Sequence, residues 1–240
     1  MKLSRRRVWA MLRKELRDMR RNGNVVYAMV ILPVVFLIQP VIQIFTLRVG
    51  ATPTLHREQS LVYLLAVPAL TPAAMAAYSI VGERVQGTLE PLLSTPIQKG
   101  ELILGKALAV FLPSVGVSYV VFALFIAVVE LFAAPGVAGA LVRAPYVVAQ
   151  LVFTPLLSGW SIWLGMAVSA RSKDLRAAGQ VSLLVSLPSV AITSLVAFDV
   201  IPASLRLALG FGIGLLVLNR IGWRVASAAL DRERLITNTR

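Results

Sequence analysis

Six apolar stretches of roughly 20 residues recur along the chain, and they restrict the fold more than any other feature. They cover residues 25–47, 61–82, 107–132, 145–169, 177–198 and 203–222. A helix needs about 20 apolar residues to cross the hydrocarbon core of a bilayer. Because 58% of the residues are apolar, only 15% are charged and the mean hydropathy is +0.79, a soluble domain is excluded. We predict an all-α polytopic membrane protein whose single transmembrane domain, over 1–240, has six transmembrane helices.

Basic residues indicate how these helices are oriented, because Lys and Arg near the ends of spans stay on the cytoplasmic side. All but four of the 24 Lys and Arg residues fall before the first stretch, in 83–106, between the fourth and fifth stretches, or in the tail. The four exceptions are Arg48, Arg57, Arg143 and Arg206. We therefore predict a multi-pass protein of the cell membrane with both termini in the cytoplasm. The net charge of +13 is explained by this topology, and we expect no nucleic-acid partner.

Residues 1–22 have the pattern of an amphipathic helix. Apolar side chains gather on one side of the predicted helix and most charges on the other; the apolar set is Val8, Trp9, Leu12, Leu16 and Met19. Such a helix can lie in the membrane interface on anionic lipid. A docking role towards a cytoplasmic partner is the alternative, and one helix can serve both. Arg13 and Arg17 belong to its charged side.

The connection 83–106 is the longest polar segment between two apolar stretches, and it carries helix-start signals. Thr95 to Gln98 matches a capping box with Pro96 at the first helical position, which predicts a helix starting there and leading into the third span. Upstream, Thr88 is a possible cap for a short helix with leucines on one side, at Leu89, Leu92 and Leu93. We predict a short cytoplasmic helix across the end of the second span.

The same connection resembles a known family. The order Glu83-Arg84, Gly87-Thr88-Leu89-Glu90, Leu92-Leu93, Thr95-Pro96-Ile97 and Gly105-Lys106, between the second and third of six spans, is similar to the signature of the type 2 ABC transporter permeases. Residues 169–178 resemble the loop between the fourth and fifth spans of that family. Residues 13–18 resemble its segment before the first span.

The resemblance implies the permease subunit of an ATP-driven ABC exporter. Two ABC nucleotide-binding subunits would dock beneath two permease copies, a homodimer in preference to a heterodimer, with ATP and Mg on the partner ATPase. The implied coupling residues are Glu83, Arg84, Gly87, Thr88, Leu89, Glu90, Leu92, Leu93, Thr95 and Pro96. The implied supporting positions are Trp9, Leu12, Arg13, Leu16 and Arg17 in the connecting helix, and Arg171, Lys173, Asp174 and Arg176 in the second cytoplasmic loop. The alternative function is a non-transporting membrane scaffold that recruits a partner through 83–97.

Residues 100–107 almost match a phosphate-binding loop, but the match fails on its chemistry. Ala107 stands where a hydroxyl should hold magnesium, and the residues between Gly100 and Gly105 form helices rather than flexible cradles. We therefore expect no cofactor in this chain.

Catalytic groups are scarce as well, because Glu130 and Asp199 lie at span ends and His56, the single histidine, has no second ligand nearby. We expect neither an enzyme nor a metal site.

Small polar residues follow one face of the fifth span, at Ser182, Ser186, Ser189 and Thr193. They suit close helix packing or the lining of a translocation path, and the second span is predicted to line the same path between protomers. Gly210 and Gly214 in the sixth span are expected to pack against a neighbouring helix. The apolar walls favour a lipid-like, drug-like or other amphiphilic solute, moved by alternating access at the dimer interface.

Overall fold

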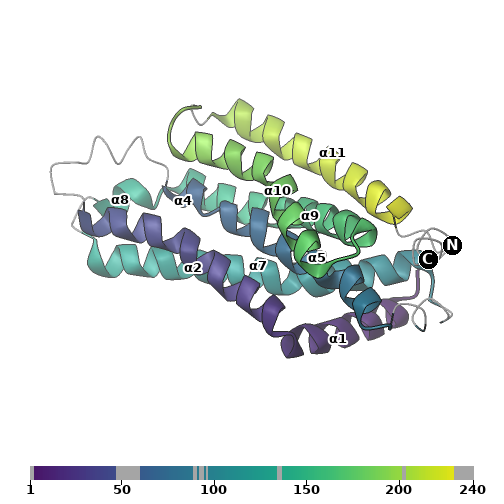
Figure 1. The fold of residues 1–240 in the computed structure, drawn as a ribbon. Helices are drawn as coiled ribbons and strands as arrows, with labels where there is room; N and C mark the ends of the chain where they lie inside the picture. Colours follow the sequence, from purple (N-terminus) through teal and green to yellow (C-terminus); the bar gives the residue numbers. More distant parts are fainter. Residues whose placement is uncertain are drawn as a thin grey trace.

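The computed structural model describes residues 3–46, 60–88, 91, 95, 97–133, 137–201 and 204–229, and every regular element within these residues is a helix (Figure 1). The helices are α1 (Arg5–Arg21), α2 (Gly23–Thr46), α4 (Ser60–Tyr63), α5 (Ala66–Val85), α7 (Lys99–Phe132), α8 (Val137–Leu141), α9 (Ala144–Arg171), α10 (Leu175–Ala197) and α11 (Leu205–Ala229). Six segments are long and apolar enough to cross a membrane: Val25–Ile42, Leu61–Val85, Lys99–Phe132, Ala144–Arg171, Leu175–Ala197 and Leu205–Ala229. The predicted fold class is confirmed.

The second span is the axis of the bundle. Buried residues make up 89% of the most apolar window of Leu61–Val85, against 11% in Leu205–Ala229, because α2, α7, α9 and α10 all pack around α5. The second span is thus enclosed by helices of its own protomer, and its role in lining a path between protomers stays a prediction. The other spans turn large apolar side chains outward, as helices in contact with lipid do.

Small residues allow α5 and α9 to approach closely. A Cβ at Gly165 of α9 would lie 2.7 Å from the carbonyl oxygen of Ala73 and 2.8 Å from the Cβ of Ala76, both in α5. At this distance serines of α9 reach the backbone of α5: the Ser161 hydroxyl donates to the Ala69 carbonyl and the Ser169 hydroxyl to the Ala77 carbonyl, each at 2.6 Å. The two helices run parallel and are held by both packing and hydrogen bonds.

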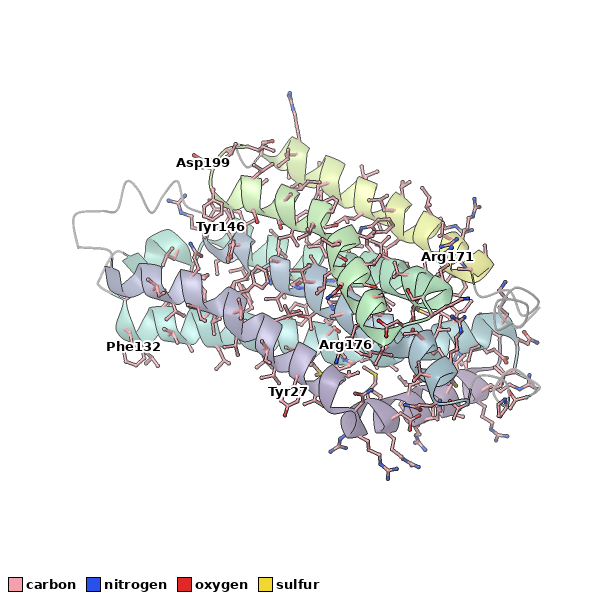
Figure 2. All side chains as sticks on the ribbon, in the orientation of Figure 1. Tyr27, Phe132, Tyr146, Arg171, Arg176 and Asp199 are labelled. Atoms are coloured by element: carbon pink, nitrogen blue, oxygen red, sulfur yellow. The ribbon has the colours of Figure 1, made fainter. Side chains whose placement is uncertain are left out.

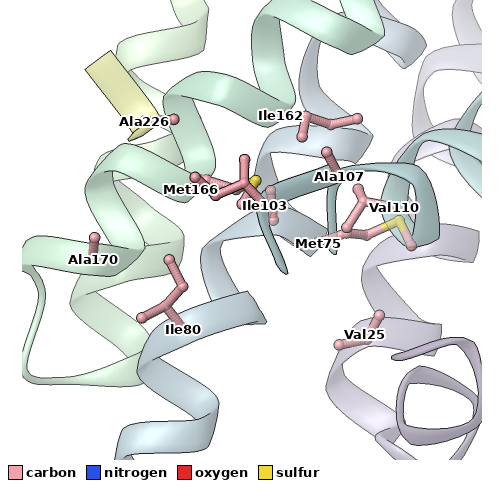
Figure 3. Packing of buried hydrophobic residues seen from close by; sticks show 11 residues of the cluster. Val25, Met75, Ile80, Ile103, Ala107, Val110, Ile162, Met166, Ala170 and Ala226 are labelled. Atoms are coloured by element: carbon pink, nitrogen blue, oxygen red, sulfur yellow. The ribbon is translucent and has the colours of Figure 1, made fainter. Parts of the chain in front are cut away.

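A hydrophobic cluster joins these helices to α7 (Figure 3). Met75 and Ile80 come from α5, Ile103 from α7, and Ile162 and Met166 from α9. All five are at most 2% exposed, so the end of the bundle that contains α1 rests on a dense core.

The two ends of the bundle differ in their charged elements. Arg171 at the end of α9 lies at the end of the bundle where α1 is, and Phe132 and Asp199 lie at the opposite end (Figure 2). We call these the α1 end and the α8 end. At the α8 end, Asp199 adopts a left-handed conformation with φ of 55°, which closes α10 and turns the chain towards α11.

The third span begins differently from the prediction. α7 starts at Lys99 rather than at Pro96, and its cap is Gln98, whose amide donates to the carboxylate of Glu101 at 3.0 Å. The predicted start at Thr95 is thus wrong by three residues, because the capping box forms between Gln98 and Glu101. α7 therefore begins two turns before residue 107, where the predicted third apolar stretch starts, and α1 packs against these two turns.

Candidate functional site

Buried ionisable side chains gather at the α1 end. Those that the structure places in the interior are Glu15 of α1, Glu83 of α5, and Glu101 and Lys106 of α7. A buried charge is costly unless it is paired, so such a gathering in a membrane protein marks either a functional site or a structural junction.

Lys106 is the centre of this charged cluster and is 1% exposed. Its ammonium group lies 3.0 Å from Oε1 of Glu15 and 2.9 Å from Oε1 of Glu83, and it donates to the carbonyl of Ser79 at 2.7 Å. The three protons of a lysine therefore each have an acceptor. The cluster binds α1, α5 and α7 together through one side chain.

Lys14 closes the cluster from the solvent side. Its ammonium group lies 2.7 Å from Oε1 of Glu83, 3.1 Å from Oε1 of Glu15 and 3.3 Å from Oδ2 of Asp18. Two lysines and the two buried carboxylates thus balance in charge, which removes most of the cost of placing them in the interior. Oε2 of Glu83 has no partner among the residues that the structure describes.

The charges of the cluster hold one another in the ionised form. Burial alone would raise the pKa of Glu15, but the ammonium groups of Lys106 and Lys14 outweigh it and hold that pKa below its ordinary value. Burial alone would lower the pKa of Lys14, but the carboxylates of Glu15 and Glu83 hold it above its ordinary value. At neutral pH both groups stay charged.

Arg84, next to Glu83 in the chain, points to a different neighbour. Its guanidinium donates to the carbonyl of Ser172 at 2.5 Å and to that of Ala170 at 3.1 Å. These carbonyls belong to the last turn and the cap of α9, where a helix has free acceptors and a negative end. Glu83 and Arg84 therefore connect the end of α5 to α1 and α7 on one side and to α9 on the other.

Glu101 forms a second junction between α1 and α7. Its carboxylate accepts the amide of Ser4 at 2.8 Å and the amide of Gln98 at 3.0 Å, and Arg7 lies 3.5 Å away. Between the two junctions a Cβ at Gly105 would lie 2.6 Å from the Cβ of Met11. The start of α1 is thus fixed to the start of α7 by charge and by close packing.

The predicted coupling residues divide between the interior and the surface. Glu83 is buried and Arg84 is half-buried and hydrogen-bonded within the protein, so both position the segment instead of presenting side chains to a partner. Gly87, with φ of 67°, and Thr88, whose amide donates to the Glu83 carbonyl at 2.9 Å, end α5 and are exposed. Thr95 is partly buried. Leu89, Glu90, Leu92, Leu93 and Pro96 lie outside the described residues.

In α1 the buried face differs from the prediction. Leu12 is buried, but it is accompanied by Met11 and Glu15, and Leu16 is partly buried. Trp9 is 53% exposed and stacks with Arg13, whose guanidinium lies 5.2 Å from the centre of the ring. The buried side chains of α1 pack on α7 and α2, and a position of α1 in the membrane interface stays a prediction. Trp9, Arg13 and Arg17 form the outer face.

The second cytoplasmic loop of the prediction lies beside the carbonyls that Arg84 caps. Arg171, Lys173, Asp174 and Arg176 are exposed, and the carboxylate of Asp174 accepts the amide of Ala177 at 2.9 Å to start α10. This loop adds exposed charge to the α1 end.

The predicted translocation residues lie inside the protomer. Ser182, Ser186, Ser189 and Thr193 are buried, and α10 packs against α5. Two of the hydroxyls bond within their own helix, from Ser186 to the carbonyl of Ser182 at 2.9 Å and from Thr193 to that of Val190 at 2.9 Å. This burial agrees with helix packing, and a role in translocation stays a prediction.

Gly210 and Gly214 have no neighbour within 4 Å of an added Cβ, so they make no close contact within this chain, and their packing against another helix stays a prediction. Gly222 fills that role in α11, because a Cβ there would lie 2.8 Å from the Cβ of Trp163.

Sequence reasoning quoted Lys106 and Glu15 within motifs that resemble the family, but it predicted neither their burial nor their pairing, and it gave Glu101 no role. A signal for Glu15 exists, because it is an acidic residue on the apolar side of a basic helix, next to Leu12 and Leu16. Lys106 stands at the head of an apolar run, which also indicates a lysine that needs a buried partner. In the described part of the chain, no group of three or more His, Cys, Asp or Glu residues could hold a metal ion.

Comparison with known proteins covers most of the chain. A family model described as "ABC-2 family transporter protein" matches residues 9–212, which begin within α1 and end in the first third of α11. The match includes the charged cluster and the five spans before α11. No curated protein matches the chain.

Proposed function

The chain belongs to the ABC-2 family of transporter proteins and is a membrane-spanning permease, as the resemblance predicted, and from this premise we propose that it is one subunit of an ATP-driven exporter. Two copies would pair and bind two separate ATPase subunits, and ATP and Mg would bind to those subunits. The solute would be lipid-like, drug-like or otherwise amphiphilic, because the spans offer apolar walls.

The arrangement of Glu83 and Arg84 is the observation that carries this proposal. A push on the segment that follows α5 reaches α1 and α7 through Glu83, and reaches α9 through Arg84. Motion of an ATPase beneath the α1 end would therefore move several spans as a rigid body. The basic residues at this end support placing it in the cytoplasm.

The surroundings of Lys106 support the proposal that ATP binds to a separate subunit and not to this chain. A phosphate-binding loop needs exposed backbone amides and a free lysine. Here residues 100–107 lie within α7, and the ammonium group of Lys106 is held by Glu15, Glu83 and Ser79.

Reconstitution tests the proposal. The permease and the ATPase encoded beside it would be placed in liposomes containing a fluorescent short-chain phospholipid, and ATP-dependent movement of the lipid and ATP hydrolysis would be measured. We expect both activities, and we expect Arg84→Ala to retain assembly but lose movement. Binding of the ATPase without movement of the lipid or of a panel of amphiphilic dyes would instead favour a scaffold.

A further inference from the structure

The face of α9 that contacts α5 continues towards the α8 end as a row of polar side chains. Gln150, Thr154 and Ser158 follow one another at intervals of four residues and are 1%, 0% and 0% exposed. Residues at this spacing lie on one face of a helix. The same face carries Ser161 and Ser169 nearer the α1 end.

The two halves of this face differ in their hydrogen bonds. Ser161 and Ser169 each donate to an α5 carbonyl at 2.6 Å. Both amide atoms of Gln150 and the hydroxyls of Thr154 and Ser158 have no partner among the described residues. One half of the face is therefore matched by the protein and the other half is not.

Helical hydroxyls often bond to the backbone of their own helix. Among the described residues the hydroxyls of Thr71, Ser182 and Ser227 also lack a partner, but Gln150, Thr154 and Ser158 form a continuous row on one face of a single helix. In the same bundle Ser118, Ser172 and Ser186 each donate to the carbonyl four residues earlier. The hydroxyls of Thr154 and Ser158 do not make this bond. The side-chain amide of Gln150 has two N–H donors and an acceptor oxygen, so one such bond could not satisfy it. Buried polar groups in native proteins are almost always partnered, so three in a row need partners from outside the chain.

The neighbouring backbone explains why the protein does not supply them. Ser161 pairs with Ala69 and Ser169 with Ala77, an offset of 92 residues in both cases. The same offset puts Thr154 level with Val62 of α4 and Ser158 level with Ala66 at the start of α5. Between these elements Leu64 and Leu65 form a turn, so the regular row of α5 carbonyls stops where the unmatched half of α9 begins.

The charge of the surroundings decides what kind of partner fits. The buried ionisable residues that the structure describes lie at the α1 end, in Glu15, Glu83, Glu101 and Lys106. A charged group beside Gln150 would have no counter-ion in a medium of low dielectric constant, which is strongly unfavourable. Amide and hydroxyl groups suit neutral partners that both donate and accept.

We propose that Gln150, Thr154 and Ser158 form a binding strip for neutral hydroxyl groups. Water occupies the strip in the resting protein, and the hydroxylated head group of an uncharged amphiphile replaces it when solute is bound. The replacement by solute rests on the proposed transport function, whereas the occupancy by water does not.

Cysteine labelling tests the strip directly, because the chain contains no cysteine. Gln150→Cys, Thr154→Cys and Ser158→Cys would be exposed to a small water-soluble methanethiosulfonate in lipid nanodiscs without the ATPase. Matched controls are Leu157→Cys, which is equally buried on the same helix, and Leu151→Cys, which faces outward. Thiolates form only where water reaches, so we expect rates at the strip at least about tenfold above both controls. Rates equal to those of Leu157→Cys would overturn the proposal.

Apolar substitution gives a second test that does not depend on the cysteine variants folding. If the strip were dry, Thr154→Val and Ser158→Ala would remove unsatisfied groups and raise Tm. If hydroxyl partners are bound, the same changes lower Tm, which is the result we expect. An increase in Tm for both variants would contradict the strip.

Protection by amphiphiles separates water from solute. Octyl glucoside, which has a neutral hydroxylated head, should slow labelling of Thr154→Cys, and dodecyltrimethylammonium at the same occupancy of the nanodisc should not. Equal slowing by both, or by neither, would overturn the solute half of the proposal. Because no ATPase or ATP is present, a failure of the transport assay leaves this result unchanged.

Discussion

Two buried polar regions of the bundle differ in whether their polar groups have hydrogen-bond or ion-pair partners within the chain. At the α1 end, Lys106 has an acceptor for each of its protons and lies among charges that balance. Towards the α8 end, Gln150, Thr154 and Ser158 are equally buried and have no partner. The first region can hold helices in one arrangement, whereas the second is able to bind something else. In the proposed exporter the first region would be the firm junction on which the ATPase acts, and the second would be an adaptable polar surface within the membrane.

The largest effect is expected from a substitution of Lys106, at the centre of the charged cluster. Lys106→Met would remove the buried one of the two lysines that Glu15 and Glu83 share and leave only the more exposed Lys14, which costs about 3–5 kcal/mol of unfolding free energy. Thermal unfolding in detergent would measure it, with Lys173→Met as the exposed control. A loss no greater than that of the control would mean that the cluster contributes nothing to the junction.

A smaller loss is expected on the α9 side of the same junction. Arg84→Met would remove two hydrogen bonds from a charged donor to the end of α9, and we expect a loss of about 1.5–3 kcal/mol. Chemical denaturation can measure this loss. Arg84→Lys keeps the charge but not the paired geometry, so it should recover only part of the loss. Full recovery would indicate that charge alone matters.

The hydrogen bonds between α9 and α5 depend on the close approach of the two helices at Gly165. Gly165→Ala would push α9 away from the backbone of α5 and weaken the bonds of Ser161 and Ser169, at a cost of about 1–3 kcal/mol. Gly116→Ala is the control, because an added Cβ there meets nothing within 4 Å. If both variants unfold at the same temperature, the close approach at Gly165 does not contribute to the stability of the contact between α9 and α5.

The smallest effect concerns pH, because the cluster stays charged over most of the scale. The pKa of Glu15 is lowered, so its contribution to stability is present above its ordinary value of 4.5 and is lost as pH falls through the folded value. The pKa of Lys14 is raised, so its contribution is present below 10.5 and is lost as pH rises through the folded value. Stability curves of the wild type and Glu15→Gln should therefore converge only in acid. Convergence at neutral pH would contradict the assigned ion pairs.

Much of the fold could be predicted from the sequence, because span length and basic flanks are local properties. The six spans follow directly from apolar runs, and the family follows from the motif after Glu83. The interior could not be predicted, since whether α5 is central depends on which helices pack around its alanines. Glu15 and Lys106 are likewise 91 residues apart in the sequence, and no local pattern predicts that they pair.

The cap of α7 shows the limit of motif reasoning. Thr95 and Gln98 fit a capping pattern, but Gln98 and Glu101 fit one too, and the carboxylate of Glu101 also accepts the amide of Ser4. A tertiary contact with α1 therefore decides between two local signals of similar quality.

The central claim is that the charged cluster makes α1 and α7 move as one body when the ATPase acts. Spin labels at Arg13→Cys and Leu112→Cys, both exposed positions in a chain without cysteine, would report the distance between the two helices in the assembled complex. We predict one narrow distance distribution that is unchanged by ATP in the wild-type background, and a broad one in Lys106→Met. A wild-type distribution that shifts or broadens with ATP as much as that of Lys106→Met would contradict the account.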